Sequence, residues 1–119
     1  MEEMMNEESI LRTIKDMLGP SACYSAFDYD IMMHINMAIN ILFQLGVGDG
    51  SFSVTSEDQT WGDYIGDDPR LNMVKDYIYA KVRKVFDPPA SSTVMTALNE
   101  TISELEWRIN VQVDPEMME

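Results

Sequence analysis

The strongest constraint on the fold is the stretch 71–109, in which two helical patterns are separated by Asp87-Pro88-Pro89. Each proline disfavours the α conformation at the residue before it. The first pattern therefore ends near the prolines, and a second helix can begin only after them. Ser91 or Ser92 is a suitable N-cap for that second helix. The stretch predicts a helical hairpin on which the rest of the chain packs.

Both helices of the predicted hairpin carry an apolar stripe at helical spacing. The core stripes are Leu71, Val74, Ile78, Val82 and Val85 in the first helix, and Val94, Leu98, Ile102, Leu105 and Ile109 in the second. Asp67-Asp68-Pro69 predicts the start of the first helix, with a carboxylate cap and proline at the first helical position. Trp107 falls roughly 180° from the centre of the second stripe, and Val111 lies near it. Two partners for Trp107 stay open: segment 47–66 of the same chain, or another subunit.

Two further helices are predicted upstream. The first covers about 7–18, with Glu7 and Glu8 in its first turn, and Gly19-Pro20 ends it. The second begins at Asp28 or Asp30 as N-cap candidates and runs to residue 45. Its apolar arc, about 160° wide, makes it a central helix. Met33, Met37 and Ile41 lie outside the centre of that arc, as surplus apolar surface for a monomer. Between the two helices, Tyr24 and Phe27 are expected to anchor a linker in the core.

The segment 47–60 is rich in Gly, Ser and Asp. Phe52 and Val54 alternate with serines, so a short strand or an extended excursion is expected there. Residues 60–65 are predicted to form one helical turn at an end of the core. The predicted fold is therefore all-α: a small bundle of about four main helices plus a short helical turn, in one domain over 1–119. Residues 1–6 and 113–119 are expected to be mobile tails.

The chain is strongly acidic, with a net charge of −13 over 119 residues. An acidic surface repels the phosphate backbone and therefore disfavours binding to nucleic acid. The same repulsion is compatible with the wall of a channel through which DNA slides. The basic residues of 71–86 are scattered around the helical wheel. No single face of this helix is therefore basic enough to bind DNA. No apolar run is long enough for a membrane span, and the acidic N-terminus does not resemble a signal peptide. We therefore expect a soluble protein that is not exported by the classical route.

The sequence offers no catalytic, cofactor or metal site. Cys23 and His34 are each the only residue of their type, which argues against a disulfide, a zinc site or a nucleophile–base pair. Cys23 is expected to be a small buried or half-buried side chain. The carboxylate clusters fit exposed surfaces better than a pocket, and the glycines at 46–50 lack the residues of a phosphate-binding loop. We predict that the protein is not an enzyme.

Several short sequence motifs, in this order and spacing, resemble those of the head–tail connector proteins of long-tailed phages. They are His34-Ile35-Asn36-x-Ala38, Gln44-Leu45-Gly46-Val47-Gly48, Trp61-x-Asp63-Tyr64-Ile65-Gly66, Val74-Lys75-x-Tyr77-Ile78-Tyr79-x-Lys81-Val82-Arg83, Phe86-Asp87-Pro88-Pro89-x-Ser91 and Glu104-Leu105-Glu106-Trp107-Arg108-Ile109. The resemblance covers about residues 7–112. It implies a helical adaptor subunit in a ring of roughly a dozen copies. It also implies that the ring docks to the portal on one side and to a stopper or tail-completion protein on the other.

The resemblance further implies that double-stranded DNA passes through the lumen without sequence-specific binding. The expected location is the neck of the virion, and the host cytoplasm during assembly. The alternative from another class is an acidic DNA mimic or inhibitor of a nucleic-acid enzyme; a small module that binds a partner helix is a third. The residues that we expect at protein interfaces are Trp107, Val111, Met33, Met37, Ile41, Phe52 and Val54.

Overall fold

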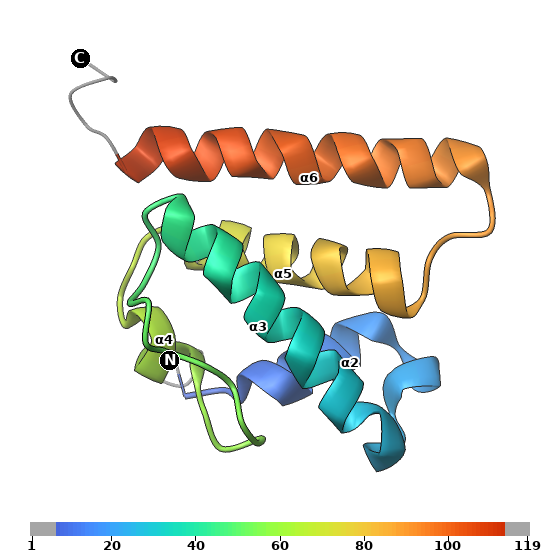
Figure 1. Cartoon of the computed structure of the whole chain (residues 1–119), viewed down its shortest axis with the longest axis horizontal. Helices are drawn as coiled ribbons and strands as arrows, with labels where there is room; N and C mark the ends of the chain where they lie inside the picture. The colour runs from blue at the N-terminus through green and yellow to red at the C-terminus, as the bar shows by residue number, and fades with distance from the viewer. Residues whose placement is uncertain (1–6, 114–119) are drawn as a thin grey trace.

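A computed structural model describes residues 7–113, and side chains as far as residue 111. The described residues form an all-α bundle, as predicted (Figure 1). Its elements are α2 (Ile10–Leu18), the 3₁₀ turns η1 (Pro20–Ala22) and η2 (Ser25–Phe27), α3 (Asp28–Gln44), α4 (Trp61–Ile65), α5 (Leu71–Phe86) and α6 (Ser92–Val113). Residue 113, expected in a tail, closes α6. The other residues expected in mobile tails, 1–6 and 114–119, lie outside the described part.

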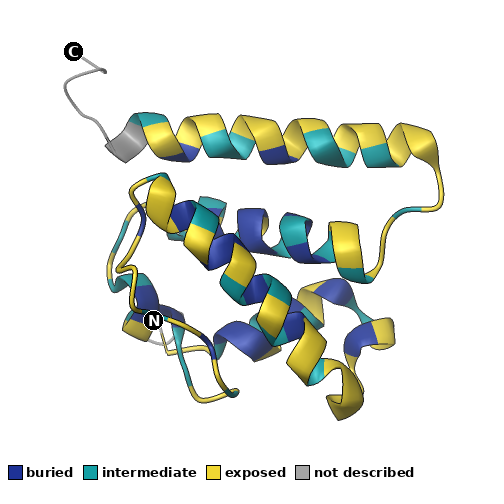
Figure 2. Ribbon diagram, viewed as in Figure 1, coloured by how far each residue is buried: buried dark blue, intermediate teal, exposed yellow. Residues whose placement is uncertain are grey.

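The helix α5 is the centre of the bundle, because it contacts α2, α3 and α6. We predicted this place for α3, which packs on α5 and α2 but has a long exposed face. Figure 1 shows α3 crossing α5 and α6 running alongside α5 as the second arm of the hairpin. The helix α6 packs chiefly on α5, so most of its circumference is exposed (Figure 2).

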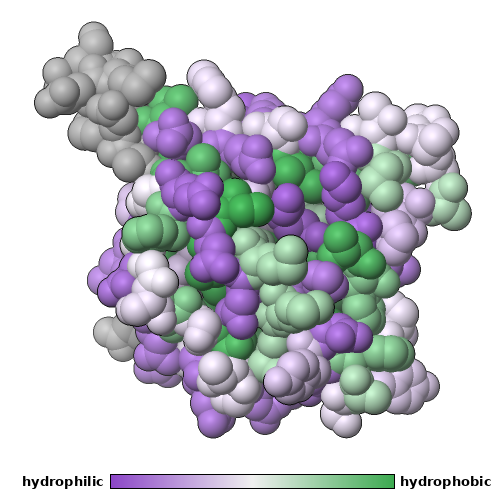
Figure 3. Space-filling model, viewed as in Figure 1, coloured by the Kyte–Doolittle hydropathy of each residue, from purple (hydrophilic) through white to green (hydrophobic). Residues whose placement is uncertain are grey.

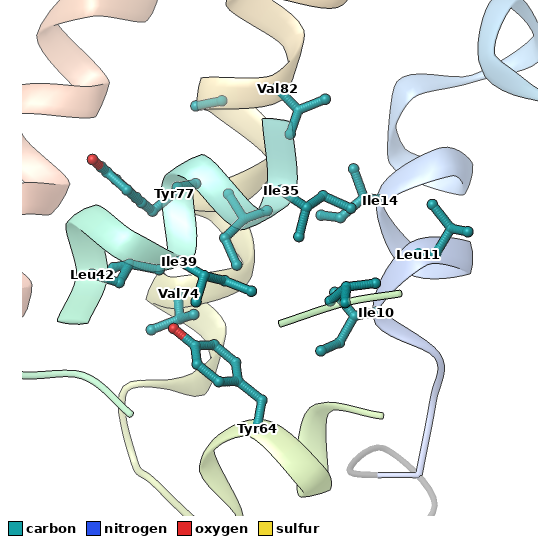
Figure 4. Packing of buried hydrophobic residues seen from close by; sticks show 14 of the residues in the cluster. Ile10, Leu11, Ile14, Ile35, Ile39, Leu42, Tyr64, Val74, Tyr77 and Val82 are labelled. Carbon is teal, nitrogen blue, oxygen red and sulfur yellow. The ribbon is translucent and has the colours of Figure 1, made fainter. Parts of the chain in front are cut away.

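The core gathers the apolar stripes of the helices, and most of the predicted members are buried (Figure 4). Two predicted members are wrong: Val85 and Val94 are exposed. Val85 lies near the end of α5 and Val94 near the start of α6, on either side of the proline connection. The buried residues Tyr77 and Ala80 were missed, because they fall outside the purely apolar stripe.

The starts of α2, α3 and α5 differ from the predictions. The helix α2 begins at Ile10 with Ser9 as its N-cap, so Glu7 and Glu8 precede it. Asp28 is the first residue of α3 rather than its cap, because its carboxylate accepts a hydrogen bond from Lys15 of α2 at 2.5 Å. The helix α5 starts at Leu71, two residues later than predicted.

Asp68 holds the chain before α5 without capping it. Its carboxylate accepts hydrogen bonds from the backbone N–H, Nε and Nη2 of Arg70, at 2.8, 2.9 and 2.6 Å. This ion pair lowers the pKa of Asp68. The pair therefore orders the turn that leads from α4 into α5.

Candidate interaction surfaces

The outer face of α6 presents Trp107 to solvent, with 67% of its surface exposed. Its neighbours on this face are polar; Arg108 pairs there with Glu104 at 2.9 Å. Val111 is half-buried. Because two-thirds of Trp107 is open to solvent, it is not packed against segment 47–66, the same-chain partner considered from the sequence. A large exposed apolar side chain among polar ones is a typical protein contact site.

A second apolar surface follows α3. Tyr29, Met33 and Met37, spaced four residues apart, are 82%, 50% and 57% exposed. We call these three residues the α3 stripe. Apolar and polar side chains are interleaved on the face of the molecule shown in Figure 3. Ile41, expected to extend this surface, is half-buried and packs against the core instead. Sequence reasoning missed Tyr29, although its four-residue spacing from Met33 was a usable signal.

The segment 47–60 forms no strand, and its apolar side chains turn into the chain's own core. Val54 is 2% exposed, so it presents no surface to a partner, contrary to expectation. Its backbone N–H donates to Asn36 Oδ1 at 2.7 Å, and its C=O accepts from Asn36 Nδ2 at 2.9 Å. The expected interface residue Phe52 is half-buried and stacks on Tyr64, with ring centroids 4.9 Å apart.

The short helix α4 closes the core at this end, as predicted. Trp61 is fully buried, and its indole N–H donates to Thr13 Oγ1 at 3.0 Å. The Lys75 ammonium lies 5.4 Å from the centre of the Trp61 ring, so this base makes a cation–π contact that sequence reasoning missed. Thr60 and Asp63 cap α4 reciprocally. These contacts together hold α4 on the core.

One hydrogen bond fixes α6 on α5. Tyr77 is fully buried, and its hydroxyl donates to Glu106 Oε2 at 2.7 Å. Burial, and then the Glu106 carboxylate, raises the pKa of Tyr77. Together with the buried Ile102 and Ile109, the bond holds α6 in one rotation about its axis. It thereby fixes the direction in which the outer face of α6 points.

The linker before α3 differs from its prediction. Tyr24 is exposed and does not anchor the core, whereas Phe27 packs edge-on against Phe86, with ring centroids 5.4 Å apart. Cys23 is exposed, not buried as expected, because η1 turns it outward from the end of α2. His34 is half-buried on α3.

The described residues show neither a metal centre nor a membrane span. Among residues 7–113, no three His, Cys, Asp or Glu side chains gather as ligands of a metal ion would. No helix in that range is both long and apolar enough to cross a bilayer. Two exposed surfaces are candidates for contact with other proteins: Trp107 on α6 and the α3 stripe.

Comparison with known proteins identifies the family to which the chain belongs. The sequence model that describes the phage connector protein family matches residues 10–116 of this chain. The chain belongs to the phage connector protein family. This family consists of structural proteins, and membership implies contact with other proteins of the phage head and tail. No curated protein and no solved structure matches this connector.

Proposed function

We propose that this connector is a subunit of a ring that joins the portal to a stopper or tail-completion protein in the neck of the virion. The observation that carries the proposal is the family match over residues 10–116. The exposed surfaces support it, because Trp107 and the α3 stripe are uncovered apolar side chains on a single copy. Ring subunits bury such side chains against neighbours.

The proposed ring holds roughly a dozen copies, assembles in the host cytoplasm and leaves a lumen for double-stranded DNA. The net charge of −13 suits such a lumen, because an acidic wall does not bind the phosphate backbone of DNA that has to move past it. The same charge led us to consider an acidic DNA mimic. The family match gives that alternative no support, since the family's role is structural.

The test is reconstitution with the portal protein encoded in the same genome. Electron microscopy of the mixture should show an added ring on one side of the portal. Met37→Ala and Trp107→Ala should each lower the fraction of portals that carry the ring. Ser103→Ala is the control, because Ser103 is an exposed α6 residue with no described hydrogen bond. If the wild-type protein never binds the portal and is absent from the neck of purified particles, the proposed function is wrong.

A further inference from the structure

Two groups of charged side chains lie in different parts of the fold, one in the last turns of α5 and one in segment 48–63. The last turns of α5 carry three bases within four residues: Lys81, Arg83 and Lys84. We call these three residues the basic end. Segment 48–63, which precedes the start of α5, exposes Asp49, Glu57, Asp58 and Asp63. We call these four residues the acidic end. The 16 residues of α5 span about 24 Å. In Figure 1, α5 ends at the right, and the loop that leads from α3 to α4 lies at the lower left.

Among the described residues, no ion pair joins a member of the basic or the acidic end to another side chain, although the exposed Asp87 follows the basic end directly. The ion pairs among the described residues join Lys15 to Asp28, Arg70 to Asp68 and Arg108 to Glu104. None of them includes a member of the basic or the acidic end. The Arg83 guanidinium meets only the neutral Tyr79 hydroxyl, at 3.4 Å. Asp49 and Asp63 accept hydrogen bonds from neighbouring backbone N–H and hydroxyl groups, which leave their negative charge in place.

Apolar side chains accompany the charges at both ends. At the basic end, Val85 and Phe27 are exposed, and Phe27 contacts Phe86 of α5. At the acidic end, the half-exposed ring of Phe43 lies beside Gly50, and its Cζ would be 3.1 Å from a Cβ at that position. Each end therefore combines charge with apolar area. This is the composition of a protein interface with an apolar centre and a polar rim.

We propose that the basic end of one copy docks on the acidic end of a second copy. Two chains of net charge −13 repel each other, and contact between two acidic ends makes the repulsion worse. Contact of unlike ends is the arrangement in which charge favours association. Such a contact joins two different surfaces of one chain, and repetition of it generates a ring if the rotation closes. The inference rests on the proposed ring and names the surfaces that form it.

The test reverses one charge at a time and then mixes the products. Lys84→Glu gives a chain with a weakened basic end, and Asp58→Lys gives a chain with a weakened acidic end. Each variant alone should associate about tenfold more weakly than the wild type, as measured by sedimentation velocity at low ionic strength. An equimolar mixture should recover association, because the reversed end of one variant fits the reversed end of the other. The double variant Asp58→Lys/Lys84→Glu should recover it as well.

Matched controls change the net charge equally at other exposed positions. Arg12→Glu pairs with Lys84→Glu, and Asp16→Lys pairs with Asp58→Lys; both controls should associate like the wild type. Because Lys84 lies in the last turn of α5, thermal melts monitored by circular dichroism must show that Lys84→Glu is folded.

Three outcomes overturn the inference. If wild-type rings form and the two reversals behave like their controls, the surfaces are wrong while the proposed function stands. If Lys84→Glu abolishes retention of double-stranded DNA and leaves association unchanged, the basic end is a nucleic-acid contact. If the wild type forms no ring alone or on the portal, the inference and the proposed function fail together.

Discussion

The hydroxyl of Tyr77 donates a 2.7 Å hydrogen bond to the carboxylate of Glu106, across the interface between α5 and α6. The two residues stand 29 positions apart, on opposite sides of the proline connection. The bond therefore exists only when the hairpin is closed in one register. Removal of this hydrogen bond is therefore a direct test of how much it stabilises the hairpin.

Tyr77→Phe should lower the free energy of unfolding by about 1.5–3 kcal/mol, because a hydrogen bond to a charged acceptor is lost. Urea denaturation at pH 7 measures the change. Tyr79→Phe is the matched control, since Tyr79 lies on the same helix and makes only a long 3.4 Å contact. Equal losses for both variants would show that the Glu106 bond does not stabilise the hairpin.

Alkaline pH should destabilise the protein through the same tyrosine. The pKa of Tyr77 is raised in the folded state, chiefly because of burial and then because of Glu106. A raised pKa means that the folded state holds the hydroxyl proton more tightly than the unfolded state does. The stabilisation is therefore complete below pH 10 and is lost as the pH rises above it. The buried Tyr64 adds to the effect. Denaturation curves between pH 8 and pH 11 should fall less steeply with pH for Tyr77→Phe than for the wild type.

Acidic pH should release the turn before α5. The pKa of Asp68 is lowered, chiefly by its side-chain hydrogen bonds with Arg70. A lowered pKa gives stability that is complete above the unfolded value, near 3.8, and is lost as the pH falls through the folded value. Asp68→Asn should therefore cost about 1–2 kcal/mol at pH 7. This difference should shrink below pH 3.8, as followed by urea denaturation across pH 2–7; a constant difference would contradict the assignment.

Asn36→Ala should loosen segment 47–60. The Asn36 amide satisfies both backbone polar groups of Val54, and buried groups left without partners cost about 1–3 kcal/mol. Hydrogen exchange should show reduced protection of the Val54 N–H. Asn40→Ala, on an exposed position of the same helix, should change stability by less than about 0.5 kcal/mol. Unchanged protection in Asn36→Ala would contradict this role.

The two tryptophans should report differently on assembly. Trp61 is fully buried and Trp107 is 67% exposed. In Trp61→Phe, the remaining fluorescence should have the long-wavelength emission of a solvated indole and be quenched strongly by acrylamide. Binding to the portal should blue-shift the emission and reduce the quenching. In the matched variant Trp107→Phe, fluorescence should not respond to binding. A response in that variant alone would place the contact elsewhere.

Much of the fold was predictable because it follows from local periodicity. The buried positions of α5, such as Val74 and Ile78, were predicted by spacing alone. Errors arose where distant groups decide the outcome. Asp28 is drawn to Lys15 instead of capping α3. Tyr77 is buried because Glu106, far along the chain, satisfies its hydroxyl.

The candidate surfaces were predicted less evenly, and for a physical reason. Exposure of Trp107 and Met33 follows from their position opposite a helical stripe. Burial of Val54 does not follow from the alternation of 47–60, because it depends on an amide of α3. Periodicity places a side chain on one side of its own element. It does not say whether another element will cover that side.

The packing of α6 chiefly on α5 has a consequence for cooperativity. A helix held by one neighbour can detach while the α2, α3 and α5 core stays folded, so its amide protons exchange through a sub-global opening. In an isolated subunit, we therefore expect the amide protons of α6 to exchange before those of the α2, α3 and α5 core. A partner that binds the outer face of α6 would raise the hydrogen-exchange protection of this helix toward that of the core.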